Sequence, residues 1–204
     1  MSAEPIMEPV MTQDPIDLLN AIEEASPVPI RPEYVEGTII VPPQPNYNHS
    51  KGAYKLAVQF TLAGFDLAGM GLGFRAAQKD GTTIAAVVPD FYVLRREPTD
   101  LDNSYLKTHR SYPIDMIALV GEVTSTNHKT DTGPKFRAYA AAGIPIYVLI
   151  NRHSKTAHCY TDPVLPGDDP TEAYYATDTK VTLGDPLPLP APYPTLDTTP
   201  FLDN

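Results

Sequence analysis

Two continuous apolar runs of strand length, separated by one helical segment, constrain the fold of this chain more than any other feature. The first run lies within residues 115–123, where Met116 to Val120 are all apolar, and the second fills residues 144–150. Between them the spacing predicts a helix over residues 130–142, because Pro134 suits a first helical turn and Gly143 suits the position just after a helix ends. A strand, a helix and a strand in this order form a right-handed crossover with parallel strands, and uninterrupted apolar runs indicate strands covered on both faces. The sequence therefore predicts an α/β fold.

Further elements surround this crossover unit. Asp14 can cap a short helix, and Asp80-Gly81 is typical of a hairpin turn. The polar segment 95–113 is interpreted as a loop that contains at most a helical turn. The fold class we expect is α/β, a mixed central sheet flanked by helices, in the order αβββαβ after an additional N-terminal strand. The periodicity predicts helices over residues 14–25 and 49–67, strands over 33–41, 73–77, 82–88, 91–94 and 155–161, and a last short hairpin over 171–183.

The prolines divide the chain into three parts. The chain has 23 prolines, and most of them lie before residue 46 or after residue 162. We therefore expect an acidic N-terminal extension with a short helix over residues 1–30, one folded domain over residues 31–183, and a Pro-rich C-terminal tail over residues 184–204.

The net charge of −10 argues at first against a nucleic-acid partner, because phosphate binding depends on Lys and Arg. The charge is unevenly distributed, however. Residues 49–158 contain 13 Lys and Arg against 9 Asp and Glu, a net of +4, whereas the flanks hold the remaining 2 basic and 16 acidic residues, a net of −14. The acidic average therefore describes the flanks, and the middle of the chain can still face a nucleic acid.

Cys159 is the only cysteine, which excludes an intramolecular disulfide and a cysteine-based zinc site. No apolar run approaches the roughly 20 residues of a membrane span, and residues 1–15 are acidic, unlike a signal peptide. We therefore expect a soluble, cytoplasmic protein without a membrane partner.

Two acids and a lysine stand at the edges of predicted elements. Asp90 precedes one strand, Glu122 ends the first buried run, and Lys135 lies in the first turns of the following helix. From adjacent strand ends, both carboxylates could reach one Mg²⁺ or Mn²⁺ ion, which would activate a water for attack on a phosphodiester. A nearby lysine can orient that water, help to deprotonate it or offset charge. Spacing alone leaves a second interpretation open, in which these acids cap a helix or form salt bridges.

The surrounding residues carry a more specific signal. Glu122 lies in Gly-Glu-Val-Thr-Ser-Thr-Asn (121–127), and Lys135 opens Pro-Lys-Phe-Arg-Ala-Tyr-Ala-Ala-Ala-Gly-Ile-Pro-Ile-Tyr-Val-Leu-Ile (134–150). Together with Val-Pro-Asp-Phe-Tyr-Val-Leu (88–94) and Glu-Tyr-Val-Glu-Gly-Thr-Ile-Ile-Val (33–41), this string closely resembles the Uma2 family (DUF820) of restriction-type endonucleases, a branch of the PD-(D/E)XK nuclease superfamily. The resemblance covers roughly residues 30–202. It implies a restriction-endonuclease-like core and makes residues 31–183 a nuclease-like domain.

Carried over by position, the resemblance implies Asp90, Glu122 and Lys135 as catalytic residues. Asp90 and Glu122 would be ligands of Mg²⁺ or Mn²⁺, with the carbonyl of Val123 as a further candidate. The superfamily usually places its lysine two residues after the second acid, where this chain has Thr124. The family's lysine has moved to the helix, which matches Lys135.

Several other residues have two interpretations. Lys129 competes with Lys135, but it precedes the expected helix cap. Glu33 and His49 match positions that the family tends to keep, and each is either an accessory residue for a second metal or a phosphate, or a structural residue. Asp131 is interpreted as a helix cap, and Tyr139 and Tyr147 as core residues with hydrogen-bonded hydroxyls. Arg95 and Arg96 could touch a nucleic-acid backbone, although such a pair is more often solvated.

The function we expect is a metal-dependent endonuclease that hydrolyses DNA phosphodiester bonds. The alternative is a nuclease-fold module that binds a nucleic acid or a protein and cleaves weakly or not at all, which the acidic flanks favour. A homodimer is expected by analogy with nucleases that cut both strands.

Overall fold

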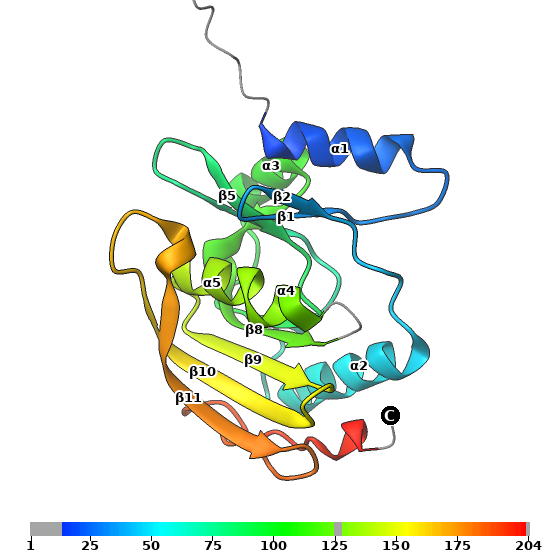
Figure 1. Cartoon of the computed structure of the whole chain (residues 1–204), viewed down its shortest axis with the longest axis vertical. Helices are drawn as coiled ribbons and strands as arrows, with labels where there is room; N and C mark the ends of the chain where they lie inside the picture. The colour runs from blue at the N-terminus through cyan, green and yellow to red at the C-terminus, as the bar shows by residue number, and fades with distance from the viewer. Residues whose placement is uncertain (1–13, 125–127, 203–204) are drawn as a thin grey trace, which may run out of the picture.

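The computed structural model describes residues 14–124 and 128–202 and arranges them as two sheets with helices between and around them (Figure 1). Residues 1–13 of the predicted N-terminal extension and residues 125–127 of the motif around Glu122 lie outside these ranges. The α-helices are α1 Pro15–Ala25, α2 Tyr47–Leu62, α3 Asp100–His109, α4 His128–Thr132 and α5 Pro134–Ala141.

The strands form one sheet of five and one of six. The first has the order β2 Thr38–Ile40, β1 Glu33–Val35, β5 Thr83–Val87, β4 Phe74–Ala77 and β7 Tyr112–Pro113. The second has the order β11 Tyr174–Thr182, β10 Thr156–Val164, β9 Ile146–Asn151, β8 Ile117–Val123, β6 Phe91–Leu94 and β3 Ala68–Gly69. Both sheets are mixed, and β8 and β9 are parallel, as the crossover unit predicted. The expected α/β class is confirmed, with its strands divided between two sheets.

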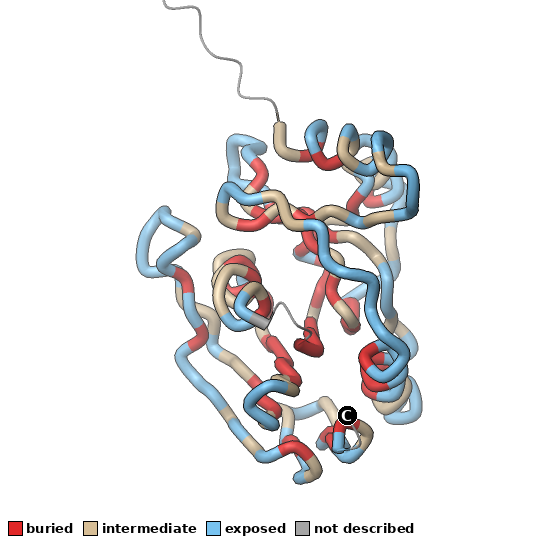
Figure 2. Tube along the Cα trace, turned by 45° about the vertical axis from the view of Figure 1, so that its right-hand side comes forward, coloured by how far each residue is buried: buried red, intermediate tan, exposed pale blue. Residues whose placement is uncertain are grey.

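The six-stranded sheet is covered on both faces, which explains the continuous apolar runs. Alternate residues of β8 point in opposite directions. Val120 joins a core cluster with α5 and the five-stranded sheet, whereas Leu119 and Val123 join a cluster with α2 and the C-terminal segment. Figure 2 shows the buried residues on these inner surfaces, while residues 41–46 cross the outside as an exposed strap from β2 to α2.

The predicted N-terminal helix is confirmed. The carboxylate of Asp14 accepts a hydrogen bond of 2.9 Å from the backbone N–H of Ile16, and the helix begins at Pro15. Ile16 and Leu19 are buried against the outer face of the five-stranded sheet. The helix thus covers the face of that sheet opposite α5.

Four predicted elements differ from the structure. Residues 33–41 form a hairpin because Glu36 and Gly37 have φ of 49° and 76°, the left-handed pair of a type I′ turn. The predicted helix over 130–142 is broken at Gly133, so neither Asp131 nor Thr132 caps α5. Residues 171–183 form no hairpin of their own: Pro170–Glu172 is a short 3-10 helix, and Tyr174–Thr182 is one long strand, β11, that pairs with β10. The helix predicted over 49–67 already ends at Leu62.

The segment 95–113 was interpreted as a loop, but it contains α3. Its start is a capping box: the Thr99 hydroxyl accepts a bond from the Asp102 N–H, and the Asp102 carboxylate accepts one from the Thr99 N–H. Leu101 is exposed, and Asp102 is the one buried residue of the helix. Because α3 has no apolar stripe, hydrophobic periodicity could not reveal it.

The proline-rich segment 184–202 packs on the domain. Leu187 and Leu196 are fully buried and pair with each other through two backbone hydrogen bonds. The side chain of Gln59 on α2 both donates to and accepts from the backbone of Asp197. Phe201 lies directly over Gly52 of α2, where an added Cβ would come within 2.3 Å of its ring. This segment therefore completes the core beneath α2.

Gly121 allows the closest contact beside the candidate site. It pairs across strands with Phe91, and a Cβ at residue 121 would lie 1.9 Å from the Phe91 ring. Because the ring covers the glycine, β6 and β8 can approach with Asp90 and Glu122 at the same edge.

We expect Gly121→Ala to destabilise the fold by about 1–3 kcal/mol, since overpacking in a well-filled core has this cost. Gly167→Ala is the matched control, because its Cβ would meet nothing within 4 Å and its φ is not positive. Urea denaturation of both variants measures the difference. Equal stabilities would contradict the close packing of Phe91 on Gly121.

Candidate active site

A buried lysine joins the two sheets at the centre of the candidate site. Lys135 on α5 donates to Glu33 of β1 at 2.9 Å and to Glu122 of β8 at 3.0 Å. The same Glu122 oxygen accepts a 2.6 Å hydrogen bond from the Tyr139 hydroxyl, and Glu33 accepts a 2.7 Å bond from the backbone N–H of Val88. All three charged side chains are buried. The structure thus brings the predicted lysine, one predicted ligand and the accessory acid Glu33 into direct contact.

Strand alternation and helix spacing produce this arrangement. Glu122 points to the same face of β8 as Val120, the face that α5 covers. Lys135 and Tyr139 are four residues apart on α5 and therefore lie on the same side of that helix. The predicted hydrogen bonds of the tyrosine hydroxyls are confirmed: Tyr139 donates to Glu122, and Tyr147 donates to the backbone carbonyl of Asp131.

Asp90 lies beside this ion pair network and is held by two donors. Its Oδ2 accepts a 2.7 Å hydrogen bond from the Val123 N–H and lies 3.1 Å from His49 Nε2. His49 Nε2 also lies 2.8 Å from the Val123 carbonyl oxygen. His49 is near the start of α2 and buried, so the second accessory residue also reaches the site.

Burial and neighbouring charges set the protonation of these groups. Burial tends to lower the pKa of Lys135, but Glu122 and Glu33 more than offset this and raise it well above its usual value. Burial raises the pKa of Glu122, and the attraction of Lys135 opposes this increase. Burial also lowers the pKa of His49, whereas its contacts with Asp90 outweigh burial and leave the pKa raised. Lys135 is therefore an ammonium at neutral pH and can donate hydrogen bonds but cannot act as a base.

These residues line a cavity of about 1200 Å³. Glu33, Asp90, Glu122, Asp131 and Lys135 lie on its wall. Prolines from residues 29–45 also line the cavity, and three of them, Pro42, Pro43 and Pro45, lie in the exposed strap between β2 and α2. The N-terminal prolines thus frame the opening above the acidic wall.

The donor set fits a hard divalent cation. Carboxylate and carbonyl oxygens are the ligands that Mg²⁺ and Mn²⁺ prefer, and Asp90, Glu122 and the Val123 carbonyl supply them. The contacts described above use Asp90 Oδ2 and Glu122 Oε1, and none of them uses Oδ1 or Oε2. Within the described ranges, no three His, Cys, Asp or Glu side chains form a metal-binding group by themselves. An ion here would therefore need the backbone carbonyl or solvent besides the two acids.

The remaining candidates lie elsewhere or have other roles. Lys129 is exposed on α4 and forms no part of the cavity wall. Arg96 pairs with Asp102, and Arg95 donates to the backbone carbonyl of Ile117 at 2.8 Å, so both serve the structure around α3 and β8. Thr124 is buried, and its hydroxyl accepts a 2.9 Å bond from the backbone N–H of Arg152.

Arg152 is a cavity residue that the sequence analysis missed. It follows the last residue of β9, and its contact with Thr124 joins positions 28 residues apart. A single Arg after a buried strand has no local pattern that distinguishes it from a surface residue. Its role could have been inferred only from knowing that β9 ends beside the acidic residues of the cavity wall.

The comparisons with known proteins agree with this fold and indicate the family. A family model for Uma2, described as "Putative restriction endonuclease", matches residues 19–193. The chain belongs to the Uma2 family. The fold is similar to the crystal structure of a putative nuclease belonging to DUF820 from Anabaena variabilis ATCC 29413, with a TM-score of 0.55, 17% identity, and coverage of 91% of this chain and 97% of that chain. No curated protein matches the chain. Among the helices described, none is long and apolar enough to cross a membrane.

In this Uma2 protein, we expect Lys135→Met to reduce the free energy of unfolding by about 3–5 kcal/mol, since removing one partner of a buried ion pair leaves the other uncompensated. Glu33 and Glu122 would both lose their counterion. Lys129→Met is the matched control, because Lys129 is exposed and such surface changes usually stay within about 0.5 kcal/mol. Chemical denaturation at pH 7 compares the two. Similar losses in both variants would contradict the importance of the buried pair.

Asp131 should make stability depend on pH. Burial raises its pKa to about 7, which Lys135 partly opposes. In the unfolded chain this pKa is about 3.9, so the native state binds the extra proton between these values and stability falls as pH rises from about 4 to 7. We expect Asp131→Asn to lessen this fall by no more than about 4 kcal/mol, since one pKa unit corresponds to about 1.4 kcal/mol.

Urea denaturation in EDTA at pH 4.5 and pH 7 measures the effect. Asp168→Asn is the control, because Asp168 is exposed and does not line the cavity. If Asp131→Asn and Asp168→Asn change with pH in the same way as the parent chain, Asp131 does not carry this dependence.

Proposed function

We propose that this Uma2 protein is a metal-dependent endonuclease that hydrolyses DNA phosphodiester bonds. Mg²⁺ or Mn²⁺ would be held by Asp90 and Glu122, with Lys135 as the third catalytic residue. The observation that carries the proposal is the convergence of Asp90, Glu122 and Lys135 on one wall of a large cavity. The family description supports a nuclease, and the DNA substrate and the ion are the proposal's own.

The ion would activate a water and offset the charge that develops on the phosphate. Asp90 is suited to hold it because the Val123 N–H and His49 fix one of its oxygens and so orient the other. Glu122 is fixed in the same way by Lys135 and Tyr139. Preorganised ligands need no reorientation at the moment of reaction, which favours catalysis.

Lys135 has a narrower role than its residue type allows. Its two contacts with carboxylates keep the ammonium charged, so it does not deprotonate a water. It can donate a hydrogen bond to an attacking water or to a phosphate oxygen at the cavity wall. Glu33 acts as a positioning residue, since it holds Lys135 from the opposite sheet.

One observation favours the alternative, a nuclease-fold module that binds a nucleic acid or a protein and cleaves weakly or not at all. His49 Nε2 lies within hydrogen-bonding distance of both Asp90 Oδ2 and the Val123 carbonyl. An ion that used these two oxygens would have to displace that contact. We further propose cytoplasmic action and a homodimer, as expected for an enzyme that cuts both strands.

Asp90→Asn and Glu122→Gln test the proposed activity better than a lysine variant, because both keep an oxygen for the internal donors. We expect each to reduce cleavage of plasmid and single-stranded DNA in Mg²⁺ or Mn²⁺ by at least about 10²-fold, the usual cost of losing one preorganised electrostatic group. Asp168→Asn keeps the parent activity. The readout is the initial rate of nicking at matched protein concentrations.

Equal traces of activity in the parent chain and the three variants would indicate a contaminating nuclease and contradict the proposal that this protein is an enzyme. Binding of labelled DNA by the parent chain without metal-dependent cleavage would instead support the alternative.

A further inference from the structure

Arg152 differs from the other basic residues of the cavity because its side chain has a buried nitrogen without a hydrogen-bond partner among the described residues. Among the described residues, three Arg and Lys residues line the cavity: Arg31, Lys135 and Arg152. Arg31 donates to the Gly71 carbonyl, and Lys135 is paired with two acids. The Nε of Arg152 is buried without a hydrogen-bond partner in the described part of the chain. A buried donor without a partner is unfavourable, so a ligand that accepts from it would be favoured.

The backbone holds Arg152 in place even though its Nε has no hydrogen-bond partner among the described residues. Its N–H donates to the buried hydroxyl of Thr124 at 2.9 Å. The turn that follows is fixed by Asn151, whose side chain accepts from the N–H groups of His153 and Ser154 at 3.1 and 3.0 Å. Thr124 occupies the place where the superfamily motif has its lysine. Thr124 has no charge of its own, but its hydroxyl holds the backbone of the cationic residue Arg152.

Arg152 is also close to the candidate ligands. Its N–H contacts Thr124, the residue that follows Val123, and both Arg152 and Thr124 line the same cavity as Asp90 and Glu122. The cation therefore faces the same part of the cavity as the proposed metal ligands. An anion bound by Arg152 would lie next to any ion held by Asp90.

We propose that Arg152 binds a phosphate group of the nucleic-acid backbone next to the bond that is cleaved. A guanidinium suits this role because its planar set of donors matches a phosphate in two-point contact and remains charged at all working pH values. The proposal rests on the proposed function, because it assigns a residue to the substrate of the same site. It assigns to Arg152 a contact with the anionic backbone that the carboxylates of the cavity wall cannot make.

The test measures binding of a fluorescein-labelled single-stranded oligonucleotide by anisotropy, first in EDTA and then in Ca²⁺, between 50 and 200 mM salt. We expect Arg152→Gln to weaken binding roughly tenfold, consistent with one hydrogen bond to a charged group. The slope of log K against log salt should fall by about 0.7, the value for one phosphate contact on a single strand. Arg152→Lys should restore the slope but only part of the affinity, since it keeps the charge and loses the planar fork.

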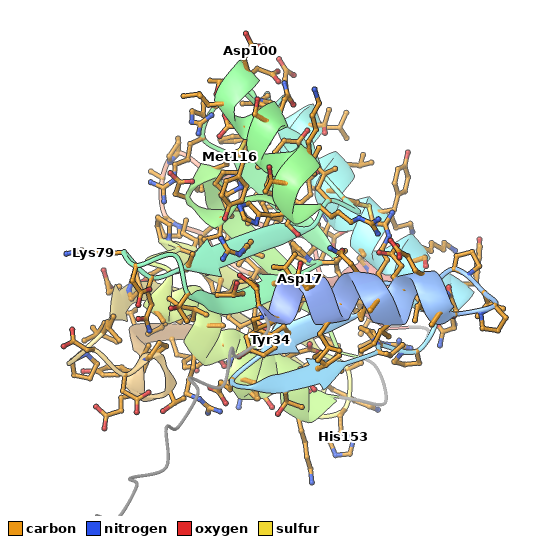
Figure 3. All side chains as sticks on the ribbon, turned by 90° about the horizontal axis from the view of Figure 1, so that it is seen from above. Asp17, Tyr34, Lys79, Asp100, Met116 and His153 are labelled. Atoms are coloured by element: carbon orange, nitrogen blue, oxygen red, sulfur yellow. The ribbon has the colours of Figure 1, made fainter. Side chains whose placement is uncertain are left out.

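Lys79→Gln is the matched control for loss of one positive charge. Lys79 is exposed in the turn between β4 and β5, and Figure 3 shows it far from His153, the neighbour of Arg152. We expect this variant to bind like the parent chain. Titration of the Arg152 variants with Mn²⁺ by calorimetry should give the parent affinity, which separates loss of phosphate binding from damage to the metal ligands. Thermal unfolding confirms that each variant is folded.

The proposal is wrong if Arg152→Gln binds the oligonucleotide like the parent chain, if Lys79→Gln loses as much affinity and slope, or if the parent chain binds no oligonucleotide. Failure of the proposed cleavage is a separate result. If the parent chain does not cut DNA but Arg152→Gln still weakens oligonucleotide binding, the phosphate contact of Arg152 is supported. Only the proposal of cleavage is then wrong.

Discussion

The buried ammonium of Lys135 is the interaction on which the candidate site and much of the fold depend. It lies between Glu33 of the five-stranded sheet and Glu122 of the six-stranded sheet, and its own helix fills the space between them. Two carboxylates can be buried at this point only because a cation lies within 3.0 Å of each. The lysine that we propose as a catalytic residue therefore also joins the layers. A loss of activity in a lysine variant would be uninformative without a measurement of its stability.

The acidic flanks have a structural explanation that alters the meaning of the net charge. Among the described residues, five of the 16 flank acids, all in the N-terminal flank, form ion pairs with Lys or Arg of the middle of the chain, so this flank is folded onto the domain. Exposed pairs of this kind add little stability, but they decide which cations remain for a ligand. The positive charge left at the cavity is small and localised, which gives individual residues such as Arg152 more weight than the overall +4 of the middle segment suggests. The pairs that remain partly exposed are Asp14 with Arg75, Glu23 and Glu24 with Arg110, and Glu36 with Arg137, whereas Glu33 with Lys135 is buried.

Sequence patterns predicted the elements whose signals are local. The apolar run of β8, the cap at Asp14 and the turn at Asp80-Gly81 each depend on neighbours within a few residues, and each is found in the structure. Helix α3 was missed because Leu101 is exposed, although Thr99 and Asp102 carried a readable capping box. The packing of the proline-rich segment under α2 depends on contacts such as Gln59 with Asp197, 138 residues apart, for which the sequence has no local signal.

The candidate site divides in the same way. Asp90, Glu122 and Lys135 were identified from the family motif, and the structure places them on one wall. The role of Glu33 could not be derived, because its partner on α5 lies 102 residues away and belongs to another layer. One oxygen of each proposed ligand is bound by internal donors, so the fold itself determines where the other oxygen points. The geometry of the acids is thus the same for a nuclease and for a binding module. The difference between the two must therefore lie in what displaces the His49 contact and in how the cavity holds a phosphate.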